Sequence, residues 1–142
     1  MTRVEFFSNA ESRLQAACDI VARIFQERLR IIIYAPDENT ARDMDKLLWT
    51  FQATGFIPHC MDFHAISSDT PVVICSGNAE MPHSEVMLNL HDDSPPLFSR
   101  FARLVEVVSS DQDDRERARA RYRFYRDRGY EIHHRDLARS EP

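Results

Sequence analysis

The 142-residue chain is 43% hydrophobic and 29% charged with a formal net charge of -5, which predicts one globular domain over residues 1–142 with a frayed tail at about 138–142. Its apolar runs are far shorter than the roughly 20 residues of a membrane helix, and no signal-peptide pattern begins the chain, so we expect a cytoplasmic protein without membrane contact. Three cysteines, each inside an apolar segment, exclude a disulfide-stapled secreted protein.

The first part of the chain predicts a strand, a helix and a second strand. Residues 4–7 form the expected first strand, and Ser8 and Glu11 provide an S-x-x-E capping box for a helix that ends near Gln26. An apolar stripe at helical spacing marks the face that covers a sheet: Leu14, Cys18, Val21 and Phe25. The run RIIIY at residues 30–34 is typical of a strand buried on both faces.

A second helix is predicted from its cap, Asp37, to about residue 51. Its core-facing stripe comprises Met44, Leu47, Leu48 and Phe51. Trp49 lies about 140° from Met44 on the helical wheel and so falls outside this stripe. Trp49, Phe56 and Pro58 either form an exposed apolar patch of the kind found at protein interfaces, or become buried when the following segment folds back.

The rest of the chain continues the alternation of strands and helices. In chain order we expect a loop over 58–70, strands over 71–76 and 85–90, a helical turn over 97–101, a strand over 103–108, a helix over 111–128 ended by Gly129, and an edge strand over 130–133. Because no hairpin signal interrupts it, this order predicts an α/β fold: a three-layer α/β/α arrangement around a mostly parallel open sheet.

Nucleotide-binding folds share that architecture but need a glycine-rich turn after the first strand. The only glycines are Gly55, Gly77 and Gly129, and none follows the first strand. We therefore expect a Rossmann-like sheet without a phosphate-binding loop, and no cofactor.

Catalytic and metal-binding patterns are also weak. Four potential ligands lie close in sequence, but their spacing resembles no zinc pattern: His59, Cys60, Asp62 and His64. Cys18 lies on the apolar stripe of its helix, where a thiol is inert. His133 and His134 would point to opposite faces of a strand and could not easily share an ion. The sequence predicts neither an enzyme nor a metal site.

The long C-terminal helix carries a basic island on an acidic chain. Residues 115–128 contain seven arginines against two acidic residues. At 100° per residue, one stripe roughly 100° wide contains Arg115, Arg119, Tyr122, Arg123 and Arg126. Ala118 and Tyr125 mark the expected inward side, and a separate flank holds Arg117, Arg121 and Arg128. Arginine suits bidentate recognition of carboxylates, so the stripe indicates a small acidic partner, with a merely solvated face as the alternative.

Two multi-residue patterns stand out in the sequence. The first is L-W-x6-F-x-P-H, carried by Leu48, Trp49, Phe56, Pro58 and His59. The second is A-R-x-R-Y-x-x-Y-R-x-x-G-[FY], carried by Ala118, Arg119, Arg121, Tyr122, Tyr125, Arg126, Gly129 and Tyr130. With these two patterns the sequence resembles the chi subunit family of bacterial DNA polymerase III. The resemblance implies a non-catalytic adaptor with the three-layer fold and no phosphate loop, which binds its partners one to one as a monomer.

In that family the C-terminal helix helps to bind the acidic C-terminal tail of single-stranded-DNA-binding protein. The resemblance implies that Arg119 and Tyr122 contact this tail, with Arg123 and Arg115 beside its aspartates. Val107 and Val108 are candidates for the apolar wall that receives the tail's terminal phenylalanine. DNA would then be contacted only indirectly.

The family's other surface binds the psi subunit, which connects chi to the clamp loader. Its residues match Trp49, Phe56 and Pro58 here, so the resemblance implies psi or another clamp-loader component as the second partner. Two rival functions remain open: a small α/β enzyme or nucleotide-binding protein with its site at the carboxyl ends of the strands, and direct single-stranded-DNA binding by the arginine helix.

Overall fold

The computed structural model describes residues 2–50, 59–61, 71–76, 84–95 and 97–137. In chain order the elements are β1 (Arg3–Ala10), α1 (Arg13–Gln26), β2 (Ile31–Ala35), α2 (Glu38–Thr50), β3 (His59–Met61), β4 (Val72–Ser76), β5 (Val86–Asn89), a 3-10 turn (Phe98–Arg100), β6 (Arg103–Ser109), α3 (Gln112–Asp127) and β7 (Glu131–Asp136).

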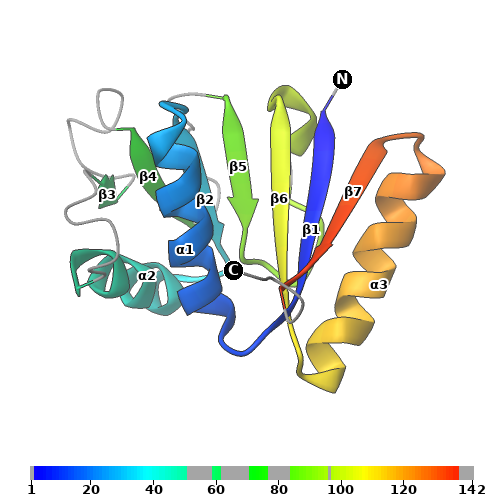
Figure 1. Cartoon of the computed structure of the whole chain (residues 1–142), viewed down its shortest axis with the longest axis horizontal. Coiled ribbons are helices and arrows are strands. Elements are labelled where there is room, and N and C mark those ends of the chain that lie inside the picture. Colours follow the sequence, from blue (N-terminus) through cyan, green and yellow to red (C-terminus); the bar gives the residue numbers. More distant parts are fainter. Residues whose placement is uncertain (1, 51–58, 62–70, 77–83, 96, 138–142) are drawn as a thin grey trace.

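These strands form one open sheet in the order β3-β4-β2-β5-β6-β1-β7, and every described pair is parallel. Helices α1 and α2 cover one face, and α3 packs against the other beside β1 and β7 (Figure 1). The three-layer fold predicted from the sequence is therefore confirmed. All five residues of β2 are buried, because this strand lies between β4 and β5 and its side chains alternate between the two apolar clusters on the faces of the sheet.

The first helix begins later than the sequence predicts. Strand β1 continues to Ala10, since its residues pair with β6 on one side and β7 on the other. Ser12, not Ser8, is the N-cap, and its hydroxyl accepts a hydrogen bond from the Gln15 backbone N–H. The prediction that Ser8 caps the first helix is therefore wrong. Pairing with β6 and β7 satisfies the backbone hydrogen bonds of these residues, so they stay in the strand.

The predicted loop over 58–70 contains a short strand. Residues His59–Met61 form β3, which pairs in parallel with β4 and begins the sheet. Residues 62–70 lie outside the described part of the chain. Three residues are too few to give a recognisable alternation, and this explains why the sequence did not reveal the strand.

Other local signals are confirmed. The Asp37 carboxylate caps α2 by accepting from the Thr40 N–H at 2.7 Å, and Asp111 caps α3 in the same way. Gly129 follows α3 with φ +82°, the left-handed conformation in which glycine ends helices. This turn fixes where α3 gives way to β7.

Candidate functional site

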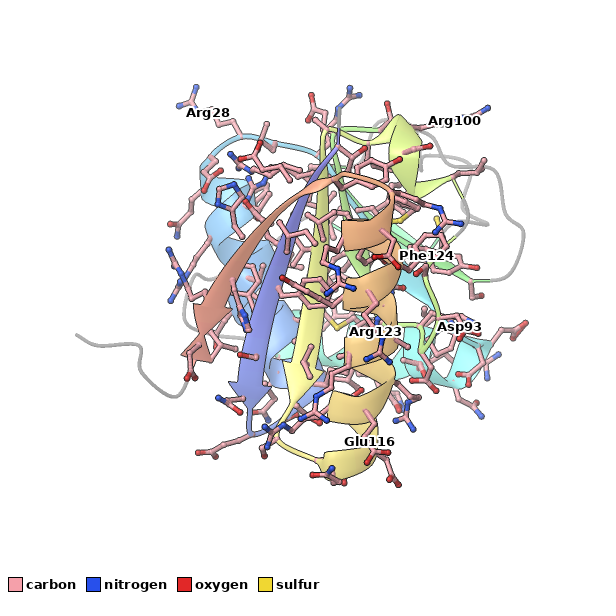
Figure 2. All side chains as sticks on the ribbon, turned by 90° about the vertical axis from the view of Figure 1, so that its right-hand side faces the viewer. Arg28, Asp93, Arg100, Glu116, Arg123 and Phe124 are labelled. Carbon is pink, nitrogen blue, oxygen red and sulfur yellow. The ribbon has the colours of Figure 1, made fainter. Side chains whose placement is uncertain are left out.

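Helix α3 presents its arginines unequally to solvent. Ala118 and Tyr125 are buried against the sheet, as the helical wheel predicted. Arg115, Arg119 and Arg123 are exposed, and Tyr122 is 38% exposed. Figure 2 views the molecule from the side of α3, with β1 and β7 alongside the helix.

A groove of about 510 Å³ lies between α3 and the strands next to it. The helix, β1, the end of β6 and β7 all contribute to its walls: Phe6, Ser8, Asn9, Val108, Arg115, Ala118, Arg119, Tyr122, His134 and Asp136. We call this cavity the α3 groove. Its volume falls in the range of pockets that bury a small ligand or a few peptide residues.

The floor of the α3 groove is apolar and aromatic. The Phe6 and Tyr122 rings meet edge to face, with centroids 5.7 Å apart. Val108 and Ala118 are both buried beside them. Val107 and Val108 were both predicted as candidates for the apolar surface that receives the tail's phenylalanine. Val108 lines the groove, whereas Val107 belongs to the core on the opposite face of the sheet. Apolar surface below and guanidinium groups above would suit an aromatic residue that carries a carboxylate.

The wall opposite α3 consists of polar side chains from β1 and β7. Ser8 Oγ and His134 Nε2 are 2.9 Å apart, and Asn9 Nδ2 donates to Asp136 Oδ1 at 2.8 Å. The strands pair in register, with Phe6 opposite His134, so alternate residues of both strands face α3. No local pattern in the sequence predicts this wall.

Three of the four predicted tail-binding residues therefore share one cavity: Arg115, Arg119 and Tyr122. Arg123 does not line it and lies on the outward face of α3 (Figure 2). Arg123 is thus placed where it could meet only the part of a ligand that extends beyond the groove.

Arg121 lies on the flank that the helical wheel separates from the stripe, and it is buried there. It is 2% exposed, and its Nε donates to Glu106 Oε1 at 3.0 Å. The Glu106 carboxylate on β6 also accepts from the Tyr125 hydroxyl and from Asn89 Nδ2. This buried network joins α3 to β6 through side-chain hydrogen bonds on the sheet-facing side of the helix.

Burial dominates the electrostatics of this network. Loss of solvation raises the pKa of the Glu106 carboxyl, against the opposing charge of Arg121 and the hydrogen bonds that it accepts. Burial, followed by the nearby Glu106 carboxylate, likewise raises the pKa of the Tyr125 hydroxyl, which therefore stays protonated as a donor. The network has a structural role, since its groups point at one another and not into the groove.

The rival nucleotide site falls where β1 and β6 end, because the chain leaves these neighbouring strands toward opposite faces. Asp114 occupies that position and is 4% exposed. Its Oδ2 accepts from the Ser109 N–H at 2.7 Å and from the Ser109 hydroxyl at 2.9 Å. A carboxylate thus takes the donors that a phosphate would need at this position.

Trp49 is 59% exposed near the end of α2, as its place outside the apolar stripe suggested. Met44 and Leu48 of that stripe are buried. The other two residues predicted for this surface, Phe56 and Pro58, lie outside the described residues. Helix α2 lies toward the β3 end of the sheet, across the molecule from α3 (Figure 1).

Within the described ranges, no group of three or more histidine, cysteine or acidic side chains could hold a metal ion. Two members of the predicted ligand set, Asp62 and His64, lie outside those ranges. Cys18 is buried, and burial raises the pKa of its thiol to about 11, so it stays protonated near neutral pH. In the same part of the chain, no helix is long and apolar enough to cross a membrane.

Comparisons with known proteins show which sequences this chain is similar to. A family model described as DNA polymerase III chi subunit, HolC, matches residues 1–133. DNA polymerase III subunit chi of Pseudomonas aeruginosa is 29% identical over 143 residues, covering 98% of this chain and 99% of that protein. The proteins of the same name from Haemophilus influenzae and Escherichia coli are each 25% identical over 119 residues, covering 83% of this chain and 83% and 81% of theirs.

Proposed function

Because the chain belongs to the DNA polymerase III chi subunit family, we propose that its α3 groove binds the acidic C-terminal tail of single-stranded-DNA-binding protein and that the chain links this protein to the clamp loader. As a chi subunit it is a non-catalytic accessory subunit of DNA polymerase III and belongs to DNA replication. The single observation that supports tail binding is the groove itself, in which two arginines and a half-exposed tyrosine surround an apolar floor.

In the proposed complex the terminal phenylalanine of the tail packs on Phe6, Val108 and Tyr122. Arg119 holds the terminal carboxylate, and Arg115 pairs with an aspartate before it. A guanidinium can donate two parallel hydrogen bonds to one carboxylate, which fixes the direction of the chain as well as its charge. Arg123, outside the groove, contributes only a weak screened attraction to the acidic residues farther along the tail.

Calorimetric titration with a nine-residue acidic peptide ending in Asp-Ile-Pro-Phe tests the site. We expect micromolar binding for the free acid and a large loss for the same peptide with an amidated C-terminus, because amidation removes the charge that Arg119 would pair with. Equal binding of the two peptides would show that the groove does not recognise a chain terminus.

The matching protein variant is Arg119→Ala. We expect it to weaken tail binding by at least tenfold, the loss typical of a charge-assisted hydrogen bond, without lowering the unfolding temperature. Arg128→Ala is the control, because it removes an equal charge from an exposed side chain that lies outside the groove and stacks on Phe124 at 3.7 Å. If the two variants bound equally well, the assignment of Arg119 would be wrong.

For the second contact, we propose that Trp49, with Phe56 and Pro58, forms the surface for psi or another clamp-loader component. The exposed indole supports this assignment, because large exposed aromatic side chains are enriched where proteins meet. Trp49→Ala should abolish co-purification with the clamp-loader component while leaving tail binding intact. If the variant still co-purified with that component, the contact would have to lie on another surface of the protein.

A further inference from the structure

The tail-binding proposal leaves the strand wall of the α3 groove without a role. We infer that His134 of β7, held by Ser8 of β1, contacts the acidic peptide and makes its binding stronger as the pH falls. This inference rests on the proposed function and adds a binding residue and a proton dependence to it.

The geometry places His134 across the groove from the arginines. It lines the same cavity as Arg115 and Arg119 but projects from the opposite wall. A ligand carboxylate inside the cavity would therefore have cationic groups on two sides once the imidazole is protonated. Histidine is the side chain whose charge ordinarily changes between pH 5 and 8.

Ser8 can hold the imidazole in both protonation states. Its hydroxyl lies 2.9 Å from Nε2 and can donate to the neutral ring or accept from the charged one. Within the described residues Nδ1 has no hydrogen-bond partner, so this nitrogen remains available to a ligand. When Ser8 donates to Nε2, the neutral ring already carries its proton on Nδ1, so protonation makes this existing donor charge-assisted without moving the ring.

The surrounding charges couple the proton to the ligand. On α3, the positive charges of Arg115 and Arg119 oppose a third cation before the peptide binds, and Tyr122 is the other titratable group of that helix in the groove. On β7, Asp136 favours the cation, while β1 contributes only uncharged Ser8 and Asn9. His134 also borders a second groove, formed by β1, β7, β6 and α1. The charged residues of this second groove are Arg3, Glu5, Arg23, Glu27, Arg103 and Arg135. An anionic peptide offsets the arginines, so peptide and proton each promote binding of the other.

The test is titration of the full chain with the Asp-Ile-Pro-Phe peptide between pH 5.5 and 8, where the peptide carboxylates stay ionised. We expect the wild-type affinity to rise about threefold toward pH 5.5, the size of one exposed ion pair. His134→Gln should bind with no such slope. His134→Arg should bind at pH 8 as tightly as the wild type does at pH 5.5.

His133→Gln is the matched control. His133 is the neighbouring residue, but it points to the other face of the sheet and pairs with Glu131 instead. It should keep the wild-type slope. A slope that persists in His134→Gln would overturn this inference alone, because the peptide would still bind. Absence of binding at every pH would overturn the proposed function as well.

Discussion

Arg121 and Glu106 form an ion pair from which water is almost completely excluded, with side-chain exposures of 2% and 0%. Such a pair is costly to bury, and Glu106 is compensated by Asn89 and Tyr125 as well as by the guanidinium. Arg121 Nη1 also donates to the Asp92 carbonyl, while its Nη2 finds no partner among the described residues. The main effect of the pair is therefore to fix the position of α3 on the sheet, and its net contribution to the free energy of unfolding is small.

Arg121→Met, Glu106→Gln and the double variant should show strong coupling in urea unfolding. Either single substitution leaves a buried charge without its counter-charge, and Arg121→Met should cost about 3–5 kcal/mol. The double variant should cost clearly less than the sum of the two. Additive losses would mean that the two groups do not depend on each other.

At the scale of the element, α3 is defined by signals at both ends. Asp111 caps its start and Gly129 ends it with a left-handed residue, so the helix spans a fixed segment and its groove-facing side stays in register with β7. A Cβ at Gly129 would meet no atom within 4 Å, so the requirement for glycine is conformational and not steric.

Gly129→Ala should therefore destabilise the protein by about 1 kcal/mol, from the backbone strain alone. Gly129→Asn should cost less, because asparagine tolerates this conformation better than alanine does. Thermal unfolding of the two variants measures the difference. Equal losses would indicate that the turn rearranges when glycine is replaced.

Local sequence patterns predicted much of α3. The features that depend on contacts between distant parts of the chain could not be predicted. The helical period placed Arg115, Arg119 and Tyr122 together because neighbours on a helix face are three or four residues apart. The burial of Arg121 depends on Glu106, which a strand delivers from another layer. The strand wall with His134 requires β7 to pair with β1 at the other end of the chain, and no local pattern encodes that choice.

On the scale of the whole molecule, the two proposed partner surfaces lie on different layers. Helix α2, which carries Trp49, lies toward the β3 end of the sheet, and α3 lies beside β7 on the opposite face (Figure 1). The α3 groove is therefore on the other side of the sheet from Trp49. Separation of this kind allows both partners to be held at once without competing for space.

The chain has a single tryptophan, and its exposed indole reports on the α2 end of the molecule. Saturation of the α3 groove with the tail peptide should leave its emission maximum and its quenching by acrylamide unchanged. A Trp49→Phe variant should bind the peptide as well as the wild type does. A shift in emission that tracks peptide binding would instead reveal coupling between the two surfaces.

The place of β1 between β6 and β7 also has a consequence for synthesis on the ribosome. Strand β1 cannot acquire either sheet neighbour until residues beyond 100 have been made, and its β7 partner begins only at Glu131. A nascent chain would therefore expose the apolar side chains of β1, such as Val4 and Phe6, for most of the translation of this domain. The groove, which needs β1, β6, α3 and β7 together, can recruit a partner only after nearly the whole domain has been translated.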